Sequence, residues 1–127
     1  MLNESSLMAF LDCDQLIRCE EVFEHKGRLW VFLELMDGGD ITKIVVSKRG
    51  DFSEAFVKYT LYSVALGLKK MHFHNILHRD IKSDNIFCRA NGDIKLADLG
   101  FSVFLTEQKA YRDTQRGTPS WISPEIA

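Results

Sequence analysis

Residues 78–100 read HRDIKSDNIFCRANGDIKLADLG, and this stretch decides the fold. Within it, Ile86–Cys88 and Ile94–Leu96 are short apolar runs, and the Asn-Gly pair between them is a strong hairpin signal. A hairpin of these two strands brings Asn85, at its entry, close to Asp98, at its exit. Two oxygen-bearing side chains at the open end of a hairpin can hold a hard cation such as Mg²⁺, which keeps water or phosphate ligands.

Asp80 stands five positions before Asn85, where its carboxylate could accept a proton from a nucleophile. The alternative interpretation is that these polar residues only form turns between strands. That alternative explains the Asn-Gly pair, but it does not explain why Asp80, Lys82, Asn85 and Asp98 follow one another in this order.

This stretch closely resembles the catalytic and metal-binding loops of eukaryotic protein kinases. Residues 78–85 match the family pattern H-R-D-x-K-x-x-N in full, and residues 98–100 match D-x-G. Lysine at position 82 resembles serine/threonine kinases rather than tyrosine kinases. The departure is Leu99, which replaces the usual phenylalanine but is still large and apolar enough to fill the hydrophobic spine.

The resemblance implies a role for each matched residue in phosphoryl transfer from ATP. Asp80 would orient the acceptor hydroxyl and take its proton. Lys82 would place a cation near the γ-phosphate. Asn85 and Asp98 would hold Mg²⁺ against the phosphates. The expected cofactors are therefore ATP and Mg²⁺, and the expected partner is a protein substrate.

Composition agrees with a soluble cytoplasmic domain. The 127 residues are 46% hydrophobic and 27% charged, with a net charge of −2. No basic excess indicates nucleic acid, and no apolar run approaches the roughly 20 residues that membrane insertion requires. Three cysteines at no metal-ligand spacing are interpreted as reduced thiols: Cys13, Cys19 and Cys88.

The first 36 residues resemble the remnant of a kinase small lobe. Residues 3–11 have the spacing of a helix end, and two strands over residues 16–24 and 28–35 follow. On this register the helix is the end of αC, and Glu4 matches the glutamate that pairs with a lysine of the small lobe. A solvated glutamate near a chain end is the alternative for Glu4. Leu33 would be the gatekeeper, and residues 34–36 the hinge.

The hinge would meet the adenine edge of ATP through the backbone of Glu34 and Met36. Asp40 then follows two glycines, and it is the expected N-cap of a short helix over residues 41–47. A hydroxyl contact from Asp40 to ribose is the functional alternative, and the cap is favoured. The short helix corresponds to the family's αD.

A long helix is expected from its cap at Ser53 to about residue 72 and corresponds to the family's αE. Its apolar residues recur at helical spacing. They are Phe56, Val57, Tyr59, Leu61, Val64, Ala65, Leu68 and Met71.

Residues 101–127 resemble an activation segment. The run GTPSWISPE at 117–125 is similar to the STE group of kinases, which includes the PAK-type and germinal-centre-type enzymes. Thr118 would contact Asp80 and help form the substrate platform. Thr114 lies where the group carries its activating phosphate, for which Arg79 would be a charge-assisted partner. An unmodified loop threonine is the alternative for Thr114.

The expected fold is α+β and protein-kinase-like, but partial. It comprises the end of αC, two small-lobe strands, the hinge, αD, αE, the catalytic-loop hairpin and the activation segment. Residues 1–36 would belong to the small lobe and residues 37–127 to the first part of the large lobe. The sequence holds no G-x-G-x-x-G and no V-A-x-K, so we expect a central fragment of a kinase, with feeble catalysis in isolation.

The predicted function is transfer of the ATP γ-phosphate to serine or threonine of a protein substrate. One alternative is a catalytically inactive, truncated kinase-like chain that acts as an interaction module. A third interpretation, an unrelated α+β fold with accidental motifs, predicts a different order of helices and strands.

Overall fold

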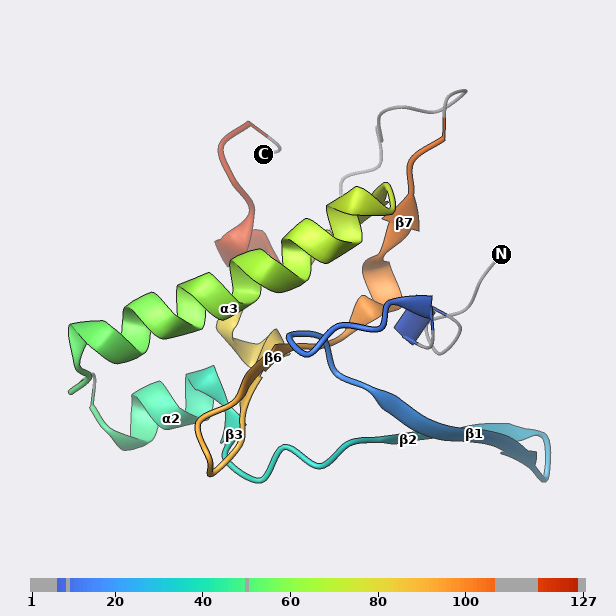
Figure 1. Cartoon of the computed structure of the whole chain (residues 1–127), viewed down its shortest axis with the longest axis horizontal. Coiled ribbons are helices and arrows are strands. Elements are labelled where there is room, and N and C mark those ends of the chain that lie inside the picture. The colour runs from blue at the N-terminus through green and yellow to red at the C-terminus, as the bar shows by residue number, and fades with distance from the viewer. Residues whose placement is uncertain (1–6, 9, 50, 107–116, 126–127) are drawn as a thin grey trace.

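The computed structural model describes residues 7–8, 10–49, 51–106 and 117–125 (Figure 1). The described part is an α+β fold of two named helices, seven short strands and three 3₁₀ turns. In chain order they are β1 (Cys19–His25), β2 (Arg28–Leu33), β3 (Gly39–Asp40), α2 (Ile41–Ser47), α3 (Glu54–Phe73), β4 (Ile76–Leu77), η1 (Ser83–Asn85), β5 (Ile86–Cys88), β6 (Ile94–Leu96), η2 (Leu99–Phe101), β7 (Val103–Phe104) and η3 (Pro119–Trp121).

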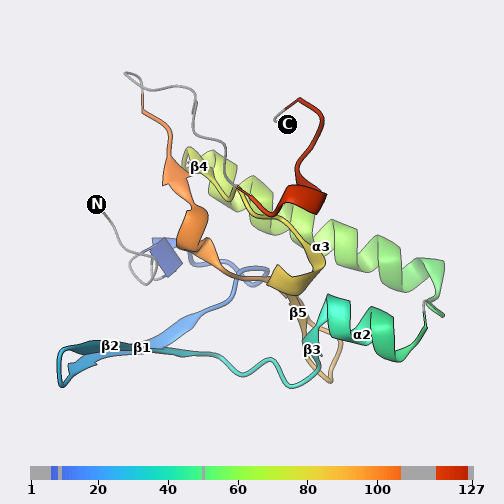
Figure 2. The same cartoon turned by 180° about the vertical axis from the view of Figure 1, so that it is seen from behind.

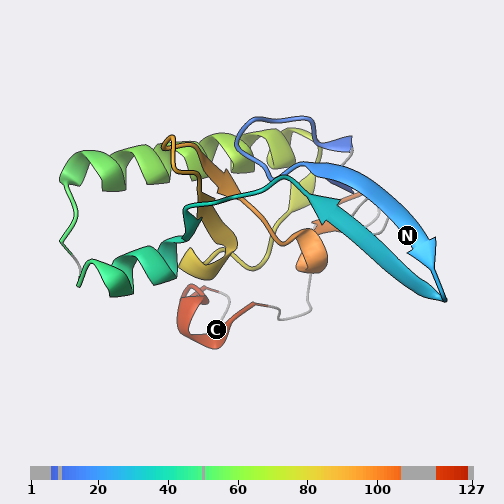
Figure 3. The ribbon, with the colours of Figure 1, turned by 90° about the horizontal axis from the view of Figure 1, so that it is seen from below.

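Strands β1 and β2 form an antiparallel hairpin that extends away from the helices (Figures 1 and 3). Lys26 and Gly27 both have positive φ, which suits a tight hairpin turn. The predicted first strand is wrong at its start, because β1 begins at Cys19. Leu16 instead forms an isolated parallel bridge with Leu96. The second strand also ends earlier than predicted, at Leu33.

Strand β5 lies between β3 and β6 in a three-stranded antiparallel sheet. The predicted strands Ile86–Cys88 and Ile94–Leu96 are confirmed at both ends. The hairpin closes its open end with a hydrogen bond from the Ala97 amide to the Asn85 carbonyl at 2.9 Å. Asn85 and the residue before Asp98 are therefore adjacent, as the turn signal indicated.

Both predicted helix caps are present. The Asp40 side chain accepts from the Lys43 amide at the start of α2, and the Ser53 hydroxyl accepts from the Phe56 amide at the start of α3. Figure 2 shows α2 beside β3 and β5, with α3 crossing above them. These helices frame the loop that connects β4 to β5.

The buried face of α3 includes only part of its apolar residues. The helix buries small or polar residues together with two apolar ones, namely Thr60, Ser63, Val64, Gly67 and Met71. Val57 and Leu61 are 46% and 64% exposed. Gly67 explains the close approach, because a Cβ there would lie 3.1 Å from Leu16 Cδ2 and 3.2 Å from the Gln15 carbonyl oxygen.

The main core lies where α3, β6 and the N-terminal residues meet. Its most enclosed side chains are Leu11, Met71, Ile76 and Leu96, each at most 2% exposed. A smaller cluster of Ile41, Cys88 and Ile94 joins α2 to the β5–β6 hairpin. Among the described residues, no helix is long and apolar enough to cross a membrane.

Candidate active site

Asp80 is the centre of a buried hydrogen-bond cluster on the loop between β4 and β5. Only 2% of the residue is exposed. Thr118 Oγ1 donates to Asp80 Oδ1 at 2.7 Å. Lys82 Nζ lies 2.9 Å from Oδ2, and Asn85 Nδ2 donates to Oδ2 at 3.1 Å and to the Asp80 carbonyl at 2.9 Å. The carboxylate is thus held from three sides, and the expected contact with Thr118 is present.

The charge of this cluster is set by its hydrogen bonds. Burial acts to raise the pKa of Asp80, but hydrogen bonds from Lys82, Thr118 and Asn85 hold that pKa below its ordinary value. The hydrogen bond to Asp80 raises the pKa of Lys82. Lys82 also donates to Thr118 Oγ1 at 2.8 Å. An ionised aspartate and a charged lysine therefore stand together at neutral pH.

His78 lies in the same loop and is 2% exposed. Its Nε2 lies 3.0 Å from the Ala97 carbonyl oxygen, and its Nδ1 accepts from the Asp80 amide at 3.3 Å. These partners assign the proton to Nε2. Burial lowers the pKa of His78, so the ring is neutral. It joins the catalytic loop to the residue before Asp98, a structural role that the resemblance implied.

Asn85 and Asp98 both line a hollow of about 450 Å³. Asp98 has the left-handed φ of 61°, and its Oδ1 accepts from the Gly100 amide at 3.2 Å. Asn85 Nδ2 donates to Asp80, so the amide oxygen is the Asn85 atom that could bind a cation. One amide and one carboxylate oxygen fit Mg²⁺ that keeps water and phosphate ligands. In the described part of the chain, no group of three or more His, Cys, Asp and Glu residues forms a metal site.

The other wall of the same hollow comes from residues 33–36. Met36 is 9% exposed and belongs to the core, so its side chain anchors this wall. Leu35 is 78% exposed. Glu34 and Met36 therefore border the hollow at the position that the resemblance assigns to the hinge.

The Glu34 side chain turns away from the backbone of the hinge into a buried ion-pair cluster. Its Oε1 accepts from Lys95 Nζ at 2.7 Å and from the Arg18 amide at 2.7 Å, and its Oε2 lies 2.6 Å from Arg89 Nη2. Burial acts to raise the pKa of Glu34, but the hydrogen bonds from Lys95 and Arg18, with the charges of Lys95 and Arg89, bring it below its ordinary value.

Sequence reasoning did not find Arg89 and Lys95, which lie 55 and 61 positions from Glu34. The only local signal was a lysine inside an apolar strand. Asp40 was found, and it acts as the predicted cap: its Oδ1 accepts from the Lys43 amide at 2.8 Å. The side-chain hydrogen bond with Lys43 also lowers the pKa of Asp40.

Two further predicted residues, Glu4 and Thr114, lie outside the described residues, so their roles stay predictions. Arg79 is described, and its Nε donates to the Phe101 carbonyl at 2.7 Å. This bond ties the catalytic loop to the 3₁₀ turn that follows Asp98.

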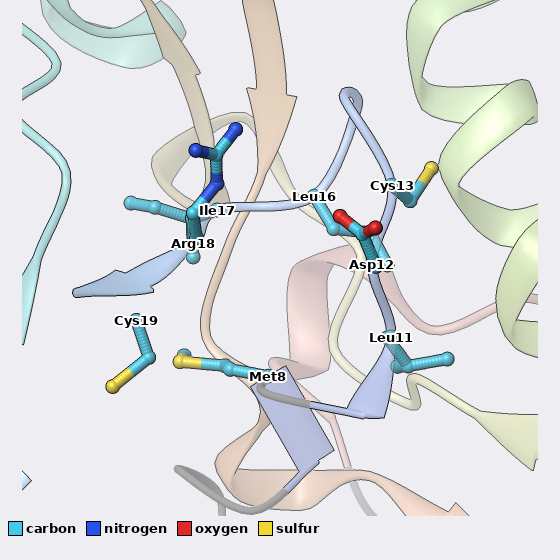
Figure 4. A pocket seen from close by; sticks show the side chains of 8 residues that line it. All are labelled: Met8, Leu11, Asp12, Cys13, Leu16, Ile17, Arg18 and Cys19. Carbon is cyan, nitrogen blue, oxygen red and sulfur yellow. The ribbon is translucent and has the colours of Figure 1, made fainter. Parts of the chain in front are cut away.

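A second hollow has a volume of about 350 Å³, and Figure 4 shows the side chains that line it. Met8 and Ile17 line both hollows. Figure 4 shows Met8 and Cys19 directing their sulfur atoms to the same side, whereas the Cys13 sulfur points toward α3. The Cys13 thiol donates to Gln15 Oε1 at 3.5 Å. This space separates the hydrophobic N-terminal residues from β1 and holds none of the catalytic-loop residues.

Comparison with known proteins identifies the fold. The protein kinase domain family matches residues 1–127. The chain is 37% identical over 126 residues to the serine/threonine-protein kinase SMU1 of Mycosarcoma maydis, covering 99% of the chain and 17% of that protein. It is 35% identical over 127 residues to the serine/threonine-protein kinase pakA of Dictyostelium discoideum, covering 99% of the chain and 11% of that protein.

A third relative, myosin-IIIb of Mus musculus, is 44% identical over 105 residues, which are 79% of the chain and 8% of that protein. The chain thus spans less than a fifth of the length of each of these three relatives.

Proposed function

This chain belongs to the protein kinase family and is similar to its STE group, and from this premise we propose that it carries the catalytic centre of a serine/threonine protein kinase. The reaction is transfer of the γ-phosphate of ATP to a serine or threonine hydroxyl of a protein substrate. Residues 1–36 would belong to the small lobe and residues 37–127 to the large lobe, with the nucleotide between them.

The observation that carries the proposal is the position of Asp80 relative to the hollow. Asn85 donates to Asp80 and lines the hollow together with Asp98. The Asn85 side chain therefore contacts Asp80 and borders the same hollow as Asp98, which supports a proton-accepting carboxylate next to two oxygen ligands for Mg²⁺. Phosphoryl transfer needs this juxtaposition, because the acceptor oxygen must be aligned with the phosphorus while charge is neutralised.

Each residue of the cluster has a task in this reaction. Asp80 is ionised, and its carboxylate would hold the substrate hydroxyl and accept its proton as the oxygen attacks. Lys82 keeps its charge because of Asp80, and it would face the negative charge of the transferred group. Thr118 holds both of them and would begin the surface on which the substrate peptide lies.

The nucleotide would be held by the opposite wall and by the hairpin end. Glu34 and Met36 would meet the adenine edge through their backbone groups. Asn85 and Asp98 would hold Mg²⁺, which supplies charge neutralisation on the phosphates when bound. A phosphate on Thr114 would be the activating modification, with Arg79 as its charge partner.

The first test is Mg²⁺-dependent ATP binding by the purified 127-residue chain, measured by isothermal titration calorimetry. Asp98→Ala removes the proposed carboxylate ligand and is expected to abolish binding. Asp84→Ala is the matched control, because Asp84 is an exposed aspartate of the same loop and is expected to leave binding unchanged.

A transfer assay on a serine- and threonine-containing protein, with Asp80→Ala, then tests catalysis. Binding by neither the chain nor the Asp98 variant would refute the nucleotide site. It would favour the alternative of an inactive kinase-like interaction module.

A further inference from the structure

The linker between β2 and β3, residues 34–38, is not part of a strand, and its residues 34–36 line one wall of the nucleotide hollow. A wall made of irregular backbone needs external support to keep its position. Figure 1 shows the linker passing beside the turn that joins β5 to β6. The contacts along this turn hold the linker through residues that do not line the hollow, namely Arg89 and Ala90.

Arg89, the first residue of that turn, binds the linker at two points. Its Nη2 lies 2.6 Å from Glu34 Oε2, and its Nε donates to the Leu35 carbonyl at 3.1 Å. The guanidinium is planar, so two N–H groups with a fixed separation contact a side chain and the adjacent backbone carbonyl at once. This geometry fixes the orientation of the peptide unit as well as its distance from the hairpin.

The turn itself is held firmly. The Arg89 amide donates to the Asp93 carbonyl at 2.9 Å, which closes the turn. Two more contacts continue along the linker: the Ala90 amide donates to Asp37 Oδ1 at 2.8 Å, and the Gly38 amide donates to the Cys88 carbonyl at 3.0 Å. The linker is thus attached to the hairpin at both of its ends, with Arg89 as the contact nearest the hollow.

We propose that Arg89 is a positioning residue for nucleotide binding. Its guanidinium holds the Glu34–Leu35 peptide at a set distance from Asn85 and Asp98 across the hollow. The inference rests on the proposed function, because nucleotide binding is the reason why this wall must keep a fixed position. Arg89 does not line the hollow, so it acts through the linker and not by touching the nucleotide.

Lys95 cannot supply the same constraint. Within the described part of the chain, its ammonium group bonds to the Glu34 side chain and to no backbone carbonyl of the linker. It is nevertheless enough to keep Glu34 paired when Arg89 is replaced, together with the Arg18 amide. Loss of Arg89 therefore loosens the linker while the buried carboxylate stays satisfied, and the fold is retained.

The test compares Arg89→Met and Arg89→Lys with the unaltered 127-residue chain. Arg28→Met is the matched control, because Arg28 is an exposed arginine at the far end of the β1–β2 hairpin. Three measurements are made: hydrogen exchange of the amides of residues 34–38 without nucleotide, the dissociation constant of Mg²⁺-ATP by calorimetry, and urea unfolding. Arg89→Lys restores the charge beside Glu34 but not the second N–H at the Leu35 carbonyl.

Arg89→Met is expected to speed exchange in the linker and to weaken ATP binding roughly tenfold, equivalent to about 1.4 kcal/mol. The urea midpoint should change little. Arg89→Lys should give an exchange rate and an ATP affinity between those of Arg89→Met and those of the unaltered chain. Arg28→Met should match the unaltered chain. Where Arg89→Met does not fold, the lysine variant gives the same comparison, because it keeps the ion pair.

Unchanged linker exchange in both Arg89 variants would overturn the proposal, and so would faster exchange with unchanged ATP affinity. A chain that binds no ATP before any substitution would instead refute the proposed function. In that case, exchange measured without nucleotide still decides whether Arg89 holds the linker.

Discussion

Replacement of Glu34 by glutamine tests whether the buried ion-pair cluster stabilises the junction between β2 and the hairpin. The carboxylate accepts from Lys95 Nζ, from Arg89 Nη2 and from the Arg18 amide, all within 2.7 Å. Glutamine keeps the shape of the Glu34 side chain, but it has no negative charge, and its N–H₂ group would face a hydrogen-bond donor. The side chain of Lys95, 6% exposed, is then left as a buried cation.

The magnitude follows from that burial. Removing one partner of a buried ion pair costs about 3–5 kcal/mol, because the remaining charge is uncompensated. Arg89 is 32% exposed and can be solvated, so most of the cost comes from Lys95. We expect the free energy of unfolding to fall by about 3 kcal/mol. That is a large part of the roughly 5–15 kcal/mol that separates folded from unfolded domains.

The assay is urea unfolding at pH 7 followed by circular dichroism. Glu54→Gln is the matched control, because Glu54 pairs with Lys58 at 2.8 Å while both side chains are more than 70% exposed. An exposed helix pair contributes about 0.3–0.5 kcal/mol. Adding Lys95→Met to Glu34→Gln removes the stranded cation, so the double variant should lose less stability than the sum of the two single losses.

The pH dependence supplies an independent check. The pKa of Glu34 is lowered in the folded chain, so its stabilisation is fully present above the unfolded pKa of about 4.3. That stabilisation is lost as the pH falls through the folded pKa. The difference in unfolding free energy between the unaltered chain and Glu34→Gln should therefore be constant near neutrality and shrink below about pH 4.3.

Two results would refute this reasoning. One is an unfolding free energy for Glu34→Gln within about 0.5 kcal/mol of the unaltered chain, the size of a surface effect. The other is a difference that persists unchanged at acid pH, which would mean that the loss comes from packing and not from the charge.

Three further substitutions test local features by urea unfolding. Gly38→Ala places a Cβ 2.7 Å from the Cys88 carbonyl oxygen and should cost about 1–3 kcal/mol; a neutral result would show that the linker moves freely. Asp40→Ala removes the acceptor for the Lys43 amide and should cost about 1 kcal/mol, where Asp40→Asn should cost less. Met71→Ala empties a position that is 0% exposed and should cost about 2–5 kcal/mol, and a smaller loss would mean that the core closes around the space.

The parts of the fold that the sequence predicts are those decided by neighbours in the chain. Asp40 and Ser53 cap helices whose first amides lie three positions away, so both caps follow from local chemistry. The β5–β6 hairpin is likewise decided by its turn residues. The contact between Asp80 and Asn85 is local as well, because the two residues lie on one short loop and bond directly.

The spacing of apolar residues does not decide burial where burial depends on the position of another segment. Val57 and Leu61 belong to the apolar residues that recur at helical spacing in α3, yet both are exposed, whereas Ser63 and Gly67 are buried. The close approach of Leu16 explains the burial of Gly67, because only a small residue leaves room for the neighbouring segment there. Periodicity shows which residues of a helix are apolar, but it does not show which face packs against another segment.

Lys95 shows the same limit at the candidate site. In β6 it stands between Ile94 and Leu96, so strand alternation puts its side chain on the opposite face from theirs. That face of a two-stranded hairpin is ordinarily open to water, and a lysine there reads as a solvated residue. Here the face is covered by the Glu34 carboxylate from a segment 61 positions earlier. A buried cation is stable only because the Glu34 anion is buried beside it. The burial of Lys95 therefore depends on Glu34, and neither burial can be predicted from one of the two residues alone.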